Sequence, residues 1–409
     1  MTLLSGGFWM AWGIGIFVTP YFQTIGFNAT RMGLINSCCA GVGIIAMSLW
    51  DIFSDKIRSI RKIVVILLIG NAIFYSLTPF LKGWFGLVFW PYFILCPVYA
   101  IFRSPSSSYQ ENLIVRNCNE LRLNYGRIRA IGSFVYTIVT ILMTAFMDKV
   151  GLERTFWLSG LAMIPMIVLF ALARDPKGAE EATEEQEKAD TAESAEEKAE
   201  KTEQKRVRKK QKIDLRPLFR SRTYVFFLIF SALFYVAFYF ENSFITFYMK
   251  DLGVSTDKFG TLSGFRALLE IPALLFLVNL RKVINYKTML WLSAFFMGLE
   301  CILLGTVVNG WSTLLPISGC FGLGSGLFIA SSLNYIYEIA PDGLKASGQA
   351  FFASISQGAS ILANLFGGFL YDAIGFRNFY LVAGITFAVS IAVFLLGGRR
   401  SDGRMMKKI

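Results

Sequence analysis

YFQTIGFNATRMG, residues 21–33, is followed 227 positions later by YMKDLGVSTDKFG, residues 248–260, and the two stretches share a Tyr and two Gly at matching places. A second match at nearly the same offset, 224 positions, lays DKVG at residues 148–151 over DAIG at residues 372–375. Two matches at nearly one offset indicate two similar halves in the same orientation. Such a parallel repeat is typical of membrane carriers whose site lies between the halves, near the membrane midplane.

The sequence around these repeats is strongly apolar. Hydrophobic residues make up 55% of the 409 residues and charged residues 17%, with a mean hydropathy of +0.53. Since about 20 apolar helical residues cross a bilayer, we expect spans near residues 2–22, 32–52, 63–81, 84–110, 129–148, 154–173, 223–249, 259–279, 287–308, 311–337, 346–371 and 378–397. The sequence thus predicts an all-α membrane protein of twelve transmembrane helices, in two pseudo-symmetric six-helix halves at residues 1–174 and 223–398.

The charged residues predict the orientation in the membrane. Residues 175–222 hold 13 basic and 13 acidic residues, so the rest of the chain carries the whole net charge of +12. Lys and Arg gather in alternate loops, around 56–62, 116–127 and 281–287, and in the tail 399–409. Because positive loops stay in the cytoplasm, we expect both termini and the charged linker 175–222 on the cytoplasmic side of the plasma membrane. The linker has too few apolar residues for a core and is expected to be a tether.

Several classes of function are disfavoured by composition. The chain has no His, and its six Cys show no paired CxxC spacing. His is the commonest catalytic base and metal ligand. We therefore expect no enzyme, no catalytic residue, no metal site and no cofactor. The excess of basic residues concerns topology and does not indicate a nucleic-acid partner; the expected partners are the lipid bilayer and a small solute, with the protein a monomer.

A few ionisable residues fall inside the predicted spans, where they are costly unless they face a partner or a water-filled cavity. In the second half, Arg266 and Glu270 stand four residues apart and predict an ion pair on one helix face. This leaves Glu241 and Glu300 without a partner in their own half, as expected of a site for a coupling proton, with sodium an open alternative. Pairing of these carboxylates with Arg103 across the halves is the structural alternative.

The loop after the second predicted span reads DIFSDKIRSIRK, residues 51–62. It resembles the GxxxD(R/K)xGR(R/K) loop of the major facilitator superfamily, although Asp51 replaces the usual Gly and one extra residue precedes Arg61. In that family the loop latches the cytoplasmic ends of the halves together. The resemblance implies a cytoplasmic gate of Asp51, Asp55, Lys56 and Arg61.

A second motif is more specific. NYGRIRAIGS, residues 124–133, is similar to the YGRxRxxGS segment of lactose-permease-like sugar and proton symporters. Glu111 lies 18 residues before Arg129, and Tyr136 seven residues after it, at the spacing of that branch's sugar-binding carboxylate, arginine and aromatic ring. The resemblance implies substrate binding by Glu111, Arg129 and Tyr136; the alternative for Glu111 and Arg129 is a purely structural ion pair between the fourth and fifth predicted spans.

The coupling residues of that branch are replaced here. Its tenth-helix His and Glu fall on Phe321 and Gly324, and its ninth-helix Arg falls on Glu300. Any proton moved by this chain must therefore travel on carboxylates, for which Glu241, Glu270 and Glu300, tuned by Arg266, are the candidates.

The function predicted is secondary active transport by alternating access, as proton-coupled symport of a sugar, glycoside or similar hydroxylated solute. Two alternatives stay open. The first is an exporter, or a carrier of aromatic acids or nucleosides, since Arg129 would also suit a carboxylate. The second is a non-transporting membrane sensor or scaffold that uses the linker to bind partners.

Overall fold

The computed structural model describes residues 1–57, 59–82, 89–123, 125–175, 215–341 and 343–398, and the described residues form helices and connecting turns. The first half comprises α1 (Thr2–Ile14), α2 (Val18–Thr24), α3 (Ala29–Ile57), α4 (Ile60–Leu77), η1 (Thr78–Leu81), α5 (Trp90–Glu120), α6 (Tyr125–Val150) and α7 (Leu152–Leu172). The second comprises α10 (Arg216–Arg220), α11 (Arg222–Asp251), η4 (Thr256–Lys258), α12 (Phe259–Leu275), α13 (Leu277–Val283), α14 (Tyr286–Thr306), α15 (Trp311–Ile339), α16 (Lys345–Ile374) and α17 (Phe376–Gly398).

Each of the twelve predicted apolar runs overlaps at least one described helix. Ten described helical segments are long and apolar enough to cross a membrane. The other two runs correspond to α5, whose second part is polar, and to α12, which is 17 residues long and is continued by α13. The all-α membrane fold is therefore confirmed. The predicted linker lies mainly outside the described residues, as does the tail.

The repeated glycines mark the turns between helices. Gly26 and Gly253, aligned by the first repeat, have φ values of 90° and 74°, and Gly151 and Gly375, aligned by the second, have φ values of 74° and 78°. A residue with a Cβ rarely adopts such a positive φ. Each half thus has the same two tight turns, and the repeated glycines are the residues that make these turns possible.

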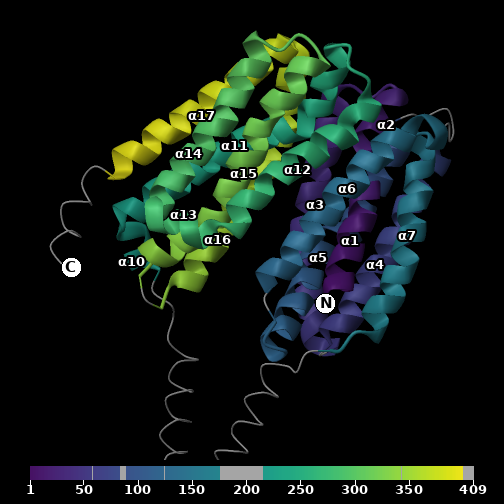
Figure 1. The fold of residues 1–409 in the computed structure, drawn as a ribbon, viewed down its shortest axis with the longest axis horizontal. Coiled ribbons are helices and arrows are strands. Elements are labelled where there is room, and N and C mark those ends of the chain that lie inside the picture. Colours follow the sequence, from purple (N-terminus) through teal and green to yellow (C-terminus); the bar gives the residue numbers. More distant parts are fainter. Residues whose placement is uncertain (58, 83–88, 124, 176–214, 342, 399–409) are drawn as a thin grey trace, which may run out of the picture.

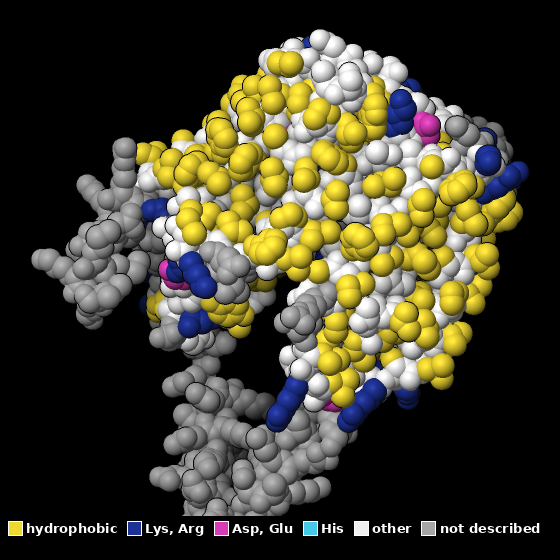
Figure 2. Space-filling view, viewed as in Figure 1, with side chains coloured by type: hydrophobic (Ala, Val, Ile, Leu, Met, Phe, Trp, Pro, Cys, Tyr) yellow, Lys and Arg dark blue, Asp and Glu magenta, His cyan; other side chains and the backbone are white. Residues whose placement is uncertain are grey.

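The halves form two helical bundles that meet at one end of the molecule and separate at the other (Figure 1). We call the end that carries Gly26, Gly151, Gly253 and Gly375 the closed end. The N-terminus and α10 lie at the opposite, open end, where the surface is hollowed between the halves (Figure 2).

Helix packing across the halves at the closed end depends on glycine. α3 packs on α16, and α6 packs on α12. A Cβ on Gly33 would lie 2.3 Å from the Asn364 carbonyl oxygen, and one on Gly260 would lie 2.3 Å from the Thr140 carbonyl oxygen. These two glycines are the remaining aligned pair of the first repeat. The repeat therefore also places one glycine of each half where its helix crosses the other half.

Polar contacts join the halves at the closed end. Oδ2 of Asp372 accepts hydrogen bonds from Asn28 Nδ2 at 2.8 Å, from the Thr30 amide at 2.9 Å and from Thr30 Oγ1 at 2.6 Å. Asp372 of the second half thereby caps the N-terminus of α3 in the first, where a negative charge is favoured. Gln23 Nε2 donates to Thr246 Oγ1 at 3.2 Å, also across the halves. The closed end is thus held by both packing and hydrogen bonds.

Candidate functional site

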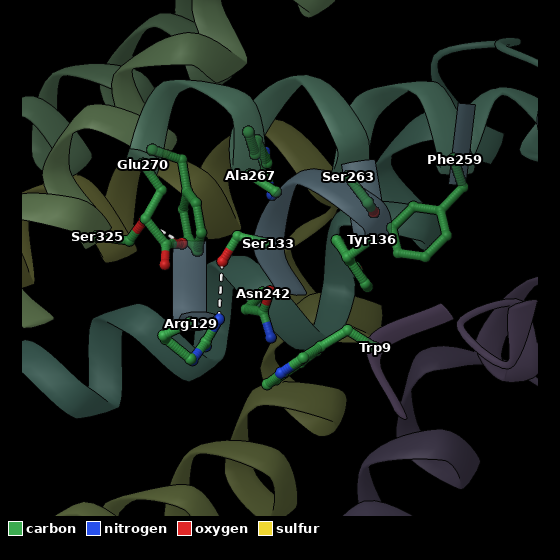
Figure 3. Close-up of a pocket in the computed structure, with 12 residues that line it drawn as sticks. Trp9, Arg129, Ser133, Tyr136, Asn242, Phe259, Ser263, Ala267, Glu270 and Ser325 are labelled. Carbon is green, nitrogen blue, oxygen red and sulfur yellow. Dashed lines mark hydrogen bonds between the residues drawn. The ribbon is translucent and has the colours of Figure 1, made fainter. Parts of the chain in front are cut away.

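A cavity of about 240 Å³ lies between the halves, bordered by α1, α6, α11, α12 and α15. Polar and charged side chains from both halves face it (Figure 3). We call it the central cavity; its lining comprises Trp9, Arg129, Ser133, Tyr136, Asn242, Phe259, Ser263, Arg266, Ala267, Glu270, Phe321 and Ser325. The structure thus brings Arg129 and Tyr136 together with Arg266 and Glu270 around one space.

Arg129 is held in place by three contacts within the first half. Its Nε donates to Glu111 Oε1 at 2.9 Å and its Nη1 donates to Ser133 Oγ at 2.7 Å. The guanidinium carbon also lies 4.4 Å from the Trp9 ring centroid. Glu111 itself is not among the residues that line the cavity, so it orients Arg129 from behind. A planar guanidinium fixed in this way can offer paired donors to vicinal oxygens.

Tyr136 and Trp9 form the aromatic part of the cavity wall. Their rings lie edge to face, with centroids 6.2 Å apart and an interplanar angle of 89°. Trp9 comes from α1 and Tyr136 from α6, two helices that pack together. Rings of this kind can cover the apolar face of a sugar while Arg129 binds its hydroxyl groups.

The second half contains a buried cluster of three charges. Arg266 Nη2 donates to Glu241 Oε1 and to Glu300 Oε1, each at 2.6 Å. The side chains of both carboxylates are at most 1% exposed, and that of Arg266 is 7% exposed. The second oxygen of each carboxylate and the Nε of Arg266 are buried without a hydrogen-bond partner among the described residues. We call this cluster, which joins α11, α12 and α14, the triad.

This geometry corrects the predicted pairing. Arg266 was expected to pair with Glu270 on its own helix and to leave Glu241 and Glu300 unpartnered, but it binds both of the latter. The reason is tertiary, because α11 and α14 present two buried carboxylates to one guanidinium, whereas Glu270 faces the central cavity. Glu270 Oε2 accepts a hydrogen bond from Ser325 Oγ at 3.4 Å.

The chain's departures from the lactose-permease pattern gather around Arg266. Glu300 binds the guanidinium, and the Phe321 ring centroid lies 4.4 Å from its central carbon. Gly324 packs on Met297 and accepts a hydrogen bond from Ser293 through its carbonyl oxygen. The replaced coupling residues are therefore neighbours in space, and two of them contact Arg266.

Among the described residues, Arg103 forms no ion pair with a carboxylate of the second half, which was the alternative considered from the sequence. Its guanidinium carbon lies 3.7 Å from the Trp12 ring centroid, with the Tyr99 ring at 5.6 Å. Its Nη1 is buried and has no hydrogen-bond partner in the described part of the chain. Arg103 is thus held by aromatic rings of the first half, an arrangement that stabilises a desolvated cation.

The predicted gate residues lie at the open end. Asp51 Oδ1 accepts from Tyr109 Oη at 2.7 Å, and Arg61 Nη1 donates to the carbonyl oxygens of Ala171 and Ala173. Lys56 is exposed, and the side chain of Asp55 lies outside the described residues. These hydrogen bonds of the Asp51 and Arg61 side chains stay within the first half.

Sequence reasoning missed several cavity residues, among them Trp9, Asn242, Ser263 and Ser325. Trp9 and Ser263 stand in ordinary apolar runs, so no local pattern distinguishes them. Ser325 lies on α15 between Gly322 and Gly326. Added Cβ atoms there would lie 2.2 Å from the Arg266 carbonyl oxygen and 2.8 Å from that of Glu270, so these glycines let α15 approach α12 closely.

Comparison with known proteins agrees with this architecture. The family model described as "MFS_1 like family" matches residues 13–382. The uncharacterized transporter YwbF of Bacillus subtilis (strain 168) is 22% identical over 378 residues, covering 90% of this chain and 84% of that protein. The maltose permease of Geobacillus stearothermophilus is 22% identical over 377 residues, covering 91% of this chain and 87% of that protein.

A solved structure shares the fold. The crystal structure of nucleoside transporter NupG superposes with a TM-score of 0.73 at 15% identity, over 98% of each chain. These proteins are transporters and not enzymes, which favours transport over the sensor or scaffold hypothesis. The two-bundle fold, the cavity between the halves and the family match agree, and the chain belongs to the MFS_1 like family as a major facilitator transporter.

Proposed function

We propose that this transporter is a proton-coupled symporter of a sugar, glycoside or similar hydroxylated solute. The observation that carries the proposal is the triad. Arg266 binds two buried carboxylates and also lines the central cavity, so it connects a proton acceptor to the solute site.

The net charge of the triad favours the binding of one proton. With all three groups ionised, the triad has a net charge of −1 in a region of low dielectric, which is unfavourable. One proton shared by Glu241 and Glu300 removes that charge and leaves a one-to-one ion pair. Arg266 is then held by one carboxylate instead of two, and its remaining donors can turn toward a solute in the cavity. Glu270, which faces the same cavity, is the third candidate acceptor.

Residues of both halves provide the proposed solute contacts. Arg129 offers paired donors, Glu270 and Asn242 offer acceptors, and Trp9 with Tyr136 provides an apolar face. This combination suits a ring that carries hydroxyl groups on its edge and C–H groups on its face. The similarity to a maltose permease supports the same solute class.

The proposed orientation in the membrane follows from the distribution of Lys and Arg among the loops. We place the open end in the cytoplasm and the closed end outside, in the plasma membrane, with the protein acting as a monomer. In this conformation the solute site opens to the cytoplasm. The gate residues Asp51, Asp55, Lys56 and Arg61 would contact the second half after the open end closes.

The test is transport by purified protein in proteoliposomes. A thermal-shift screen of sugars and glycosides selects the solute, and its uptake is then driven by a pH gradient or a sodium gradient. Glu241→Gln and Glu300→Gln should abolish pH-driven accumulation but retain counterflow, because exchange needs no net proton movement. Glu338→Gln, at an exposed surface pair with Arg281, is the matched control. If both triad variants accumulate solute fully under a pH gradient, the triad does not take part in proton coupling. If a sodium gradient alone drives accumulation, the coupling ion is sodium and not the proton.

A further inference from the structure

A second cavity, of about 460 Å³, adjoins the central cavity on the side of the open end. On α11 its lining residue Tyr239 lies three positions before Asn242 of the central cavity, and on α15 its lining residue Phe328 lies three positions after Ser325. Residues three apart on a helix are neighbours, about 5–6 Å apart at Cβ. The two spaces are therefore one helical turn apart along two separate helices. We call the second one the vestibular cavity.

The two cavities differ in charge. The central cavity is lined by Arg129, Arg266 and Glu270, whereas none of the described residues that line the vestibular cavity is charged. Its polar side-chain groups are hydroxyls and amides, from Ser108, Tyr235, Tyr239, Ser332, Gln349, Ser356 and Gln357. Hydroxyl and amide groups both donate and accept hydrogen bonds. A neutral group with donors and acceptors on its edge matches this lining, and an ionised group would find no counter-charge there.

Aromatic rings form one wall of the vestibular cavity. The Tyr235 ring lies 5.4 Å from that of Phe328 and 5.6 Å from that of Phe352, centroid to centroid, and stacks on Tyr239 at 6.2 Å. The Phe328 ring also stacks on Phe234 at 3.9 Å. The wall is thus fixed by mutual packing before any solute arrives, and it offers ring faces suited to a flat aromatic partner.

Size points the same way. The central cavity is smaller than the roughly 300–1,000 Å³ of ordinary ligand pockets, whereas the vestibular cavity beside it lies within that range, so the central cavity by itself holds only part of a solute of ordinary size. We infer that the solute has two parts: a hydroxylated ring in the central cavity, and a flat, uncharged aromatic ring linked to it, in the vestibular cavity. Nucleosides and glycosides with an aromatic aglycone both fit this description, whereas aromatic acids do not.

The inference rests on the proposed function for the hydroxylated part, so the experiment tests the two separately. Equilibrium binding to the purified full chain is measured by calorimetry for matched pairs: glucose with phenyl β-glucoside, galactose with phenyl β-galactoside, and ribose with adenosine. In at least one pair the ring-bearing compound should bind at least tenfold more tightly than the free sugar. Equal affinity within every pair would overturn the inference.

Two variants test whether the higher affinity of the ring-bearing compounds arises in the vestibular cavity. Ala353→Phe fills the vestibular cavity from an exposed position on α16 and should cancel the tenfold advantage while leaving the affinity for the free sugar unchanged. Ala346→Phe, exposed on the same helix but not among the lining residues, is the control and should change neither affinity. An advantage that survives Ala353→Phe would contradict the inference.

Arg129→Ala separates the two proposals. It should weaken binding of both members of a pair, because it removes the donors for the hydroxylated part. If Arg129→Ala leaves both affinities intact, the proposed solute site is wrong, whereas the vestibular result still stands or falls with Ala353→Phe.

Discussion

At the residue scale, the triad depends on charge balance more than on any one side chain. Arg266 neutralises two buried carboxylates, and removing the cation leaves both uncompensated. We expect Arg266→Ala to lower the free energy of unfolding by about 3–5 kcal/mol, the usual cost of breaking a buried ion pair. Thermal unfolding in detergent measures this. The triple variant Arg266→Ala, Glu241→Gln, Glu300→Gln should recover most of the loss, and failure to recover would show that Arg266 stabilises the fold by packing on Phe321 instead.

Arg129 gives a second prediction at this scale. It binds Glu111 and Ser133 through different nitrogens while stacking on Trp9. Lysine keeps the charge but has a single nitrogen and no planar face. Arg129→Lys should therefore weaken solute binding at least tenfold, or about 1.4 kcal/mol, with the melting temperature changed far less. Glu111→Gln, which keeps an acceptor for Arg129, should have a smaller effect on the same calorimetric titration; equal losses would mean that Glu111 contacts the solute directly.

At the scale of the helix, the crossing of α3 with α16 depends on the missing side chain of Gly33. Gly33→Ala places a Cβ 2.3 Å from a backbone oxygen of α16, which a rigid helix cannot move aside. The closed end should therefore separate. Spin labels at positions 82 and 250, on exposed sites of the two halves in a cysteine-free background, would report a longer distance. Gly41→Ala, on the same helix with its nearest neighbour atom 4.0 Å away, is the control and should leave the distance unchanged.

At the scale of the whole molecule, polar contacts add to helix packing in holding the two halves together at the closed end. Asp372 accepts three hydrogen bonds from the other half, each contributing about 0.5–1.5 kcal/mol. Asp372→Ala should shift the population of conformations toward an opened closed end, seen as a second, longer component in the same spin-label measurement. Asp257→Ala removes an acceptor that binds Ser255 within its own half, so it should leave the distribution as in the wild type.

The sequence by itself determined the all-α membrane fold, and its repeats indicated two similar halves. Apolar runs of membrane length leave the backbone no alternative to helix, and the repeated glycines are required wherever the chain turns with positive φ. It also singled out Arg129, Glu111 and Tyr136, whose described contacts lie within one half. It named every charged member of the triad as well.

Only the tertiary structure decided which charges meet. The spacing of Arg266 and Glu270 favoured a pair within one helix, yet Arg266 binds Glu241 and Glu300, which lie 25 and 34 residues away on other helices. Local spacing fixes which residues share a helix face, whereas the partner of a buried charge is set by the neighbouring helices that exclude water from it. The same holds for Trp9 and Asn242, which belong to a site only because two halves of one chain close around it.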